Sequence, residues 1–283
     1  MRRHRAVPLR RGIHRPAAFM LTSLLKRLFL RRFRVPWRNP LPPGEQAAWQ
    51  RLRVASASGA SLAVWFGAAR TPTAAATLVL GHPLGKAAKG YFLTRDYAEL
   101  LRAQGYHVVL FDFNGFGESS VGSFAYPADI VAVGQAAQAL TPGLPLGYFG
   151  VSLGAHMAVL ALADARHPYQ FALLESALTT LDEYAVHFPW AYRALRLLAW
   201  RRPAMVRSFR MVGRIGQARG LASLLLVYSE TDPITPAAMG RRLQQRSAVP
   251  TELWTVPAGR HTDLLNSPHR AAYVAKLLAS RAP

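Results

Sequence analysis

Short apolar runs alternate with helical patterns along most of the chain. Six runs are typical of buried strands: residues 77–80, 107–111, 144–149, 171–174, 223–228 and 253–256. Apolar residues spaced three and four apart predict helices: residues 91–104, 126–140, 153–165, 236–245 and 263–279. Residues 51–69 suggest a hairpin that turns at Ser58-Gly59-Ala60. Strands that alternate with helices predict an α/β fold, with a mostly parallel sheet and helices on both of its faces.

Residues 177–220 interrupt this alternation. The segment has no clear strand, and it follows the strand that ends near Glu175. We therefore expect a short helical insertion, or cap, over one edge of the sheet. The predicted organisation is one domain over residues 46–283, with the insertion at about 177–220. A basic, proline-containing arm precedes it at residues 1–45, for which an amphipathic helix and partial disorder both stay open.

The chain is strongly basic, with 35 Lys and Arg against 14 Asp and Glu and a net charge of +21. Residues 1–44 hold twelve of the basic residues and no acid, and a second acid-free stretch lies between Glu183 and Glu230. Such a charge suits nucleic acid or an anionic membrane, although an Arg- and Ala-rich composition is also typical of a GC-rich genome. We find no zinc-finger, RNP-type or helix-turn-helix pattern, and so expect no nucleic-acid partner.

An anionic membrane surface is the partner that the arm favours. Four leucines lie on one helical face, with basic residues mostly opposite: Leu21, Leu24, Leu25 and Leu28 against Lys26, Arg27, Arg31 and Arg34. Large apolar residues accompany arginine in the arm and, with less support, in the insertion: Phe19, Phe29 and Trp37, then Trp190, Tyr192, Leu197 and Trp200. The alternative is that these tryptophans pack inward as core or as the wall of a substrate pocket.

Neither a membrane span nor a secretory signal is expected in the arm. Its apolar run, residues 16–25, is shorter than the ~20 residues that cross a bilayer, and no small-residue cleavage site follows it. We expect a cytoplasmic protein, with peripheral membrane contact left open. The chain has no cysteine, which excludes disulfides, cysteine-ligated metals and a thiol nucleophile.

Residues 147–155, GYFGVSLGA, place Ser152 between two glycines where a strand pattern turns into a helix pattern. On such a turn a serine stands clear of the backbone, and bulkier residues at Gly150 and Gly154 would strike neighbouring elements. The N–H of Leu153, at the start of the helix, would point toward a developing oxyanion. A glycine-rich turn with an incidental serine is the alternative.

A serine nucleophile needs a base and an acid that orients it. His261 follows the last strand in a glycine-containing loop, PAGRHTD. Asp232 follows the strand at 223–228, in SETDPITP. The order Ser152, Asp232, His261 is that of α/β-hydrolases. Glu230 and Glu175 remain substitutes for Asp232.

Over nearly all of residues 50–283 the sequence resembles the α/β-hydrolase superfamily. GVSLG resembles its nucleophile elbow, SETDPITP its acid loop, GRHTD its histidine loop, and FDFNGFGES (111–119) its Asp-x-Arg-Gly-x-Gly-x-Ser turn. A closer similarity is to the serine-aminopeptidase-like and depalmitoylase-like branches. The resemblance implies an α/β-hydrolase fold and structural roles for Asp112 and Glu118. Asn114 departs from the usual Arg.

The oxyanion loop reads GHPLG, which departs from the commoner His-Gly form. Leu84 would supply its second N–H by position, with Gly85 the alternative, because Pro83 has none. We expect a serine hydrolase of small-molecule or lipid acyl esters or thioesters. It would act through a Ser152-His261-Asp232 triad and an acyl-enzyme, with no cofactor and no metal. An amidase or peptidase on the same triad, or a non-catalytic binding protein on this fold, are the alternatives.

Overall fold

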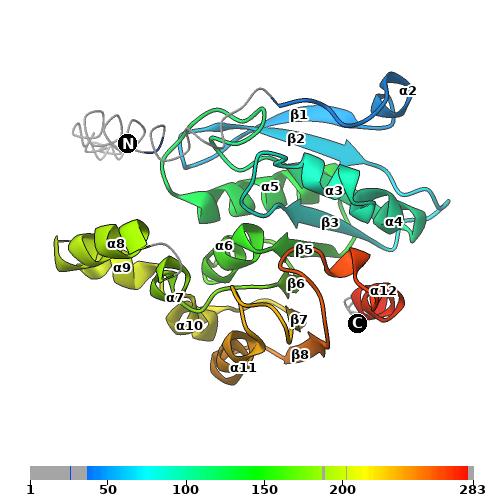
Figure 1. Ribbon diagram of the computed structural model, residues 1–283. Helices are drawn as coiled ribbons and strands as arrows, with labels where there is room; N and C mark the ends of the chain where they lie inside the picture. Colours follow the sequence, from blue (N-terminus) through cyan, green and yellow to red (C-terminus); the bar gives the residue numbers. More distant parts are fainter. Residues whose placement is uncertain (1–25, 27–36, 187–188, 202, 280–283) are drawn as a thin grey trace, which may run out of the picture.

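The computed structural model describes residues 26, 37–186, 189–201 and 203–279 (Figure 1). Its centre is a single eight-stranded sheet in the order β1-β2-β4-β3-β5-β6-β7-β8. The strands are β1 (Gln50–Ala55), β2 (Ser61–Gly67), β3 (Ala76–Gly81), β4 (Tyr106–Phe111), β5 (Leu146–Val151), β6 (Phe171–Glu175), β7 (Ser223–Ser229) and β8 (Thr251–Val256). The β1–β2 hairpin is antiparallel, β2 pairs antiparallel with β4, and all later pairs are parallel. The expected α/β-hydrolase architecture is confirmed.

Helices cover both faces of the sheet because its strands are apolar on both sides. Along β3, Val79 belongs to the core on one face, while Leu78 and Leu80 belong to the core on the other. The first face carries α5 (Tyr126–Leu140), α6 (Leu153–Ala161) and α11 (Ala237–Arg246). The second carries α3 (Gly90–Thr94), α4 (Tyr97–Ala103) and α12 (Arg270–Ala279).

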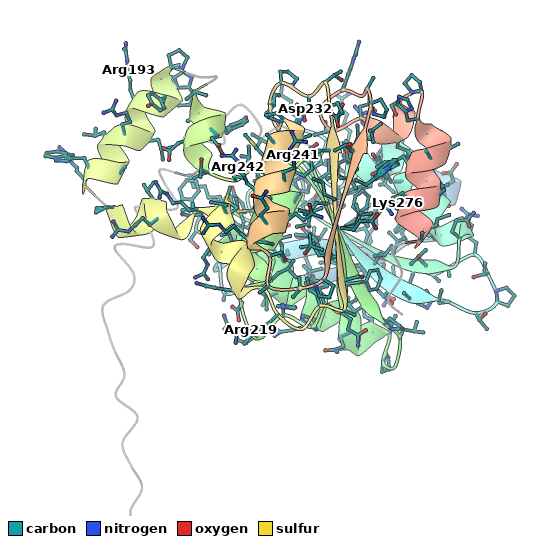
Figure 2. The ribbon with its side chains drawn as sticks, turned by 90° about the horizontal axis from the view of Figure 1, so that it is seen from below. Arg193, Arg219, Asp232, Arg241, Arg242 and Lys276 are labelled. Atoms are coloured by element: carbon teal, nitrogen blue, oxygen red, sulfur yellow. The ribbon has the colours of Figure 1, made fainter. Side chains whose placement is uncertain are left out.

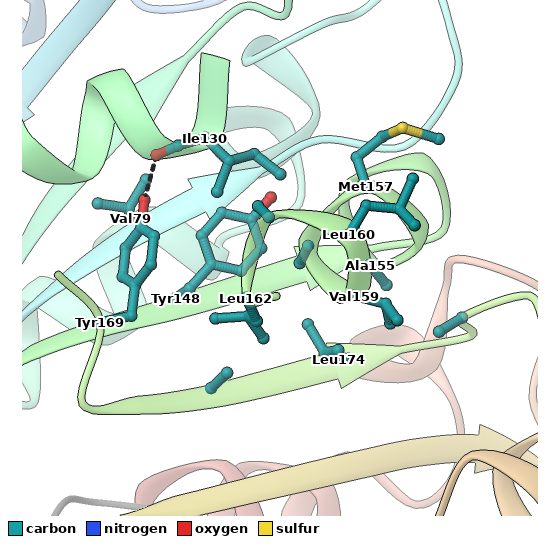
Figure 3. Close-up of a cluster of buried hydrophobic side chains, with 14 of the residues drawn as sticks. Val79, Ile130, Tyr148, Ala155, Met157, Val159, Leu160, Leu162, Tyr169 and Leu174 are labelled. Atoms are coloured by element: carbon teal, nitrogen blue, oxygen red, sulfur yellow. Dashed lines mark hydrogen bonds between the residues drawn. The ribbon is translucent and has the colours of Figure 1, made fainter. Parts of the chain in front are cut away.

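The core on the first face joins the sheet to the helix that follows the elbow. Figure 3 shows Val79, Tyr148 and Leu174, from three strands, in one cluster with Val159 of α6. A hydrogen bond from the Tyr169 hydroxyl to the Ile130 carbonyl oxygen, 2.7 Å long, ties this core to α5. The helix α6, which begins directly after Ser152, is therefore packed against a tightly filled hydrophobic core.

Two predicted helices are interrupted. Residues 91–104 form α3 and α4, since Asp96 takes a left-handed conformation (φ 62°) that asparagine and aspartate tolerate better than most residues. Residues 263–279 form a short 3₁₀ turn, η2 (Leu264–Asn266), and α12. Pro268 separates the two, because the residue before a proline is driven to extended angles and Ser267 has ψ 165°. The helix predicted at 153–165 ends at Ala161.

The expected insertion is present as helices between β6 and β7. It comprises α7 (Leu181–Ala185), α8 (Pro189–Arg201), α9 (Pro203–Ser208), α10 (Met211–Arg214) and the 3₁₀ turn η1 (Ile215–Gln217). Met211 and Ile215 are buried in the first-face core, so α10 and η1 anchor the insertion. By contrast, α8 and α9 project beyond the layers of the sheet and its helices (Figure 1).

Two residues of the predicted arm, Trp37 and Lys26, pack against the domain, and membrane binding by the arm stays a prediction. Trp37 packs edge-on against Trp65, with ring centroids 5.6 Å apart, and its Nε1–H donates to the Ala87 carbonyl oxygen over 2.9 Å. The buried Lys89 ammonium lies 3.7 Å from the centroid of the Trp37 ring. This cation–π contact with Lys89 holds the Trp37 indole against the domain. Trp37 lies six residues before the start of α2 (Pro43–Gln46).

Lys26, expected on the cationic face of the arm, is fully buried. Its ammonium donates to Asn114 Oδ1 and, over 2.6 Å, to the Ser123 carbonyl oxygen, and it lies 4.0 Å from the Tyr126 ring centroid. Burial lowers the pKa of Lys26 to about 7, against the opposing charge of Asp129. Lys26 thus brings a cation to Asn114, where the family turn usually carries its own arginine.

The rest of the expected amphipathic arm, including Leu21, Leu24, Leu25, Leu28, Phe19 and Phe29, lies outside the described residues. Within the part of the chain that the structure describes, no helix is long and apolar enough to cross a membrane.

Candidate active site

Ser152 stands at a sharp turn between β5 and α6. Its backbone has φ 48° and ψ −108°, outside the usual regions for an L-residue. A Cβ added at Gly154 would lie 2.0 Å from the Gly81 carbonyl oxygen, and one at Gly150 would lie 2.7 Å from the Ala155 nitrogen. The glycines flanking the serine are therefore required by close backbone packing, as the sequence predicted. The Ser152 N–H donates to the Glu175 carbonyl oxygen over 2.9 Å and fixes the turn to β6.

The structure brings the three predicted residues together from three separate loops. Ser152 Oγ lies 3.0 Å from His261 Nε2, and His261 Nδ1 lies 2.7 Å from Asp232 Oδ2. An ionised carboxylate can only accept, so Nδ1 carries the proton and Nε2 faces the serine as an acceptor. This is the arrangement in which an imidazole can take the proton of the serine hydroxyl.

Asp232 is buried and held by its own turn. Its Oδ1 accepts from the N–H of Ile234 (2.8 Å) and of Thr235 (3.2 Å), and its Oδ2 accepts from the Thr235 hydroxyl (2.5 Å). Burial raises the pKa of Asp232, but the hydrogen bond and charge of His261, followed by Thr235, outweigh it and lower the pKa to about 2. The carboxylate is therefore charged at neutral pH. Sequence reasoning missed Thr235, although Asp followed by a hydroxyl residue in a proline-framed turn is a usable signal.

Neither alternative acid contacts the histidine. Glu230 is exposed, and its backbone N–H donates to the Val256 carbonyl oxygen. Glu175 is fully buried and accepts from the Tyr273 hydroxyl over 2.5 Å, while its Oε1 has no hydrogen-bond partner among the described residues. Burial is the main cause that raises the pKa of Glu175 to about 7, and the charges of Asp263 and Asp232 add to it.

A second buried histidine fixes the oxyanion loop. His82 Nε2 accepts from the Phe113 N–H over 3.1 Å, so Nδ1 carries the proton and donates to the Pro83 carbonyl oxygen over 2.8 Å. Burial lowers the pKa of His82, which keeps the ring neutral. The loop that carries Leu84 is thus locked to the end of β4. Sequence reasoning quoted His82 as part of a motif but gave it no role.

The two predicted oxyanion donors come from two different segments of the chain. Leu153 is the first residue of α6, where a backbone N–H has no carbonyl of its own helix to bind. Leu84 follows the His82-Pro83 turn. Their joint action on an oxyanion stays a prediction.

Tyr91 of α3 is hydrogen-bonded to the loop that carries His261. Its hydroxyl donates to the Thr262 carbonyl oxygen over 2.6 Å, and Thr262 itself has a left-handed φ of 62°. Arg95, one turn further on, pairs with Asp263. These contacts restrain Thr262 and Asp263, the two residues that follow His261. The local sequence pattern did not predict either contact.

Two other buried polar side chains, Lys89 and His156, have structural partners. Lys89 donates to Asp112 Oδ2 and to Glu118 Oε2, each over 2.6 Å, in agreement with the structural roles that the resemblance implied. His156 Nδ1 accepts from the Leu178 N–H over 3.0 Å, and burial, followed by the charge of His261, lowers its pKa to about 3. Among the residues that the structure describes, no three His, Asp or Glu side chains are grouped to hold a metal ion.

Two known proteins are similar to this chain over part of its length. An uncharacterized protein of Mycobacterium tuberculosis is 33% identical over 177 residues, which are 59% of this chain and 57% of that protein. The lysophosphatidylserine lipase ABHD12 of Gallus gallus is 28% identical over 159 residues, 53% of this chain and 42% of the lipase. The matches thus span about half the length of these relatives.

Solved structures share the fold at low sequence identity. An esterase of Pyrococcus furiosus has a TM-score of 0.66 at 16% identity, covering 86% of this chain and 94% of its own. An α/β serine hydrolase without lid from Xanthomonas campestris has a TM-score of 0.56 at 20% identity, covering 85% and 94%. At such identities the likeness speaks for the fold alone.

One family model matches the sequence itself, over residues 72–218, which is more than half of the chain. The matched part runs from the start of β3 through the oxyanion loop and the serine turn into the insertion, and it ends before the acid and histidine loops. That family is described as serine aminopeptidase, S33. The chain belongs to this family of α/β hydrolases.

Proposed function

We propose that the protein hydrolyses acyl esters or thioesters, with Ser152 as nucleophile, His261 as general base and Asp232 as the acid that orients it. The observation that carries the proposal is the continuous pair of contacts, 3.0 Å from Ser152 Oγ to His261 Nε2 and 2.7 Å from His261 Nδ1 to Asp232 Oδ2. The depressed pKa of Asp232 supports it, since a charged carboxylate stabilises the imidazolium that forms in the reaction.

In the first half-reaction, Ser152 Oγ attacks the acyl carbon while its proton passes to His261 Nε2. The carbonyl oxygen becomes an oxyanion, which the N–H groups of Leu153 and Leu84 would stabilise. The oxyanion then collapses, and the bond to the leaving group breaks. His261 gives its proton to the departing alkoxide or thiolate, and the acyl group stays on Ser152.

In the second half-reaction, water replaces the leaving group. His261 Nε2 takes one proton from the water, whose oxygen attacks the acyl carbon of the ester on Ser152. Collapse of the second oxyanion releases the carboxylic acid, and the proton returns from His261 to Ser152 Oγ. Asp232 stays ionised throughout, and no step requires a metal or cofactor.

Esters stand first because a relative that matches 53% of this chain is named as a lysophosphatidylserine lipase. A peptidase or amidase is the second candidate, because the family model is described as serine aminopeptidase and the same acyl-enzyme chemistry cleaves amides. A non-catalytic binding role would leave the aligned contacts of Ser152 and His261 without a use.

A fluorophosphonate probe tests the nucleophile directly. We expect labelling of the wild-type chain and none of Ser152→Ala. The variant loses one side-chain hydrogen bond, between Ser152 Oγ and His261 Nε2, and no apolar packing, so its unfolding midpoint should stay close to that of wild type. Hydrolysis of p-nitrophenyl esters of increasing chain length, beside aminoacyl p-nitroanilides, separates ester from amide preference. We expect Ser152→Ala to lower kcat by roughly 10⁴- to 10⁶-fold. An unlabelled wild-type chain, or an Ala variant with wild-type rates, would refute the proposal.

A further inference from the structure

Large apolar side chains are exposed on α8. Among the described residues only five large hydrophobic side chains are strongly exposed, and four of them belong to the insertion: Val186, Trp190, Leu197 and Trp200. Trp200 is 75% exposed and Trp190 62%. Single exposed apolar residues are ordinary on protein surfaces, but two exposed tryptophans on one helix are not.

These side chains share one face of the helix. At ~100° per residue, Trp190, Arg193, Leu197 and Trp200 fall within about 80° of one another around the axis. Arg196 and Arg201, both exposed, flank this face on either side. We call Trp190, Arg193, Leu197 and Trp200 the α8 face. It combines an apolar stripe with guanidinium groups.

The rest of the described chain leaves the α8 face uncovered. The main packing partners of α8 are α7 and α9, which are themselves parts of the insertion. Figure 1 shows α8 and α9 standing away from the sheet. The tryptophans therefore do not wall a substrate pocket in this structure, which was the alternative left open by the sequence.

The charged residues of α8 and α9 are all arginines. From Glu183 to Glu230 the sequence has eight arginines and no acidic residue between them. No salt bridge of the described residues involves an arginine of α8 or α9. A surface that pairs unneutralised arginine with exposed tryptophan is complementary to anionic headgroups above an apolar interior.

We propose that the α8 face docks the protein on an anionic phospholipid surface. Trp190, Leu197 and Trp200 enter the headgroup boundary, while Arg193 and its neighbours meet lipid phosphates. A nucleic acid would match the charge but has no apolar interior in which three side chains of one helix could be buried. An acidic protein with an apolar groove is the competing partner, and the test below distinguishes it from lipid.

Docking in this way sets the orientation of the site, a step that rests on the proposed function. The insertion begins at the end of β6, whose last residue, Glu175, accepts the hydrogen bond from the Ser152 N–H. Figure 2 shows Arg193 and Asp232 toward the same end of the molecule, and Arg219 toward the opposite end. A bilayer against the α8 face is therefore close to the end that carries the site, where an acyl chain could leave the lipid for Ser152.

The test measures binding of the full chain to phosphatidylcholine vesicles with and without phosphatidylglycerol, at low and high salt. One variant is Trp190→Ser with Trp200→Ser, and another is Arg193→Gln with Arg196→Gln. The matched control, Arg219→Gln with Arg241→Gln, removes the same charge from exposed residues elsewhere (Figure 2). All six side chains are exposed, so each variant should fold.

We expect binding that requires phosphatidylglycerol and weakens with salt. Each α8 variant should bind roughly tenfold or more weakly, and the control should change by less than about threefold. Fluorophosphonate labelling of every variant should equal wild type, and Ser152→Ala should bind vesicles normally, which separates failure of docking from failure of the hydrolase.

Several results would overturn the proposal. One is absence of vesicle binding at low salt. Another is a control variant that binds vesicles as weakly as the α8 variants do, which would mean that binding depends on overall charge and not on the α8 face. A third is self-association that Trp190→Ser with Trp200→Ser abolishes, which would make the α8 face an interface between copies. Tighter binding to an acidic polymer than to vesicles, lost in the same variants, would likewise refute a lipid partner.

Discussion

Replacing Glu175 with glutamine should remove a pH dependence of stability that the wild-type chain carries. Glu175 is fully buried at the end of β6, and burial is the main cause that raises its pKa from 4.5 to about 7. The difference of about 2.5 pH units corresponds to about 3.4 kcal/mol at 1.36 kcal/mol per unit. Glutamine keeps an oxygen that can accept from the Tyr273 hydroxyl but cannot ionise.

The sign follows from where the proton is held more tightly. The folded protein binds this proton more strongly than the unfolded chain, so the associated stability is fully present below pH 4.5 and is lost as the pH rises through about 7. Between about pH 5 and pH 8 the wild type should lose about 2.5 kcal/mol through this group. That is a large fraction of the ~5–15 kcal/mol by which domains are stable.

Urea unfolding of wild type and Glu175→Gln at several pH values in this range measures the effect. The difference in unfolding free energy between the two should shift by about 2.5 kcal/mol in favour of the variant as the pH rises. Glu230→Gln is the matched control, because Glu230 follows the next strand, β7, but is exposed, so its difference from wild type should stay nearly constant. A constant difference for Glu175→Gln as well would refute the assignment of a raised pKa to this carboxyl.

Three further changes test other parts of the site and the arm. Asp232→Asn should lower kcat for ester hydrolysis roughly 10⁴-fold, because the amide favours the wrong histidine tautomer; Glu230→Gln should leave kcat nearly unchanged, and equal defects would mean that the acid is misplaced. Tyr91→Phe removes the 2.6 Å hydrogen bond to the Thr262 carbonyl oxygen; kcat should fall about tenfold while stability drops by only about 1 kcal/mol, and an unaffected kcat would exclude a positioning role for Tyr91. The pKa of Lys26 is about 7 in the folded protein against 10.5 ordinarily, so the unfolded chain holds more protons between these values. Wild-type stability should therefore rise by about 1.4 kcal/mol per pH unit relative to Lys26→Met over that range, and parallel urea curves would contradict the burial of Lys26.

Local sequence was sufficient for the strands and for the serine turn. A strand needs only a short apolar run, and the alternation with helices indicates that the strands form a parallel sheet. The order of the strands within the sheet, with β4 between β2 and β3, came only from the structure. The turn at Ser152 was predictable because its requirement is local. Two glycines must stand where side chains would strike the backbone of Gly81 and Ala155, and a glycine is visible in any sequence.

Breaks inside helices were only partly accessible from the sequence. Pro268 is a local signal for the break before α12, because the residue before a proline is driven to extended angles. The break at Asp96 could not be predicted from the sequence, because a left-handed aspartate is stable only when tertiary packing on both sides compensates for its backbone strain. Tyr91 and Phe92 before the break and Tyr97 after it pack against one another there.

The sequence by itself determined the fold class, the strand order along the chain and three candidate residues in three loops. Only the tertiary structure decided that Ser152 and His261, 109 residues apart, lie within 3.0 Å, and that Thr235, Tyr91 and His82 brace them. The tertiary structure also decided which side chains pack inward and which face solvent. Lys26 and Trp37 pack against the domain, whereas Trp190 and Trp200 are exposed. The physical reason is range. Apolar periodicity and turn chemistry act over a few residues, but a hydrogen-bond partner, the pKa that depends on it and the exposure of a side chain are set by segments that meet only after the chain has folded.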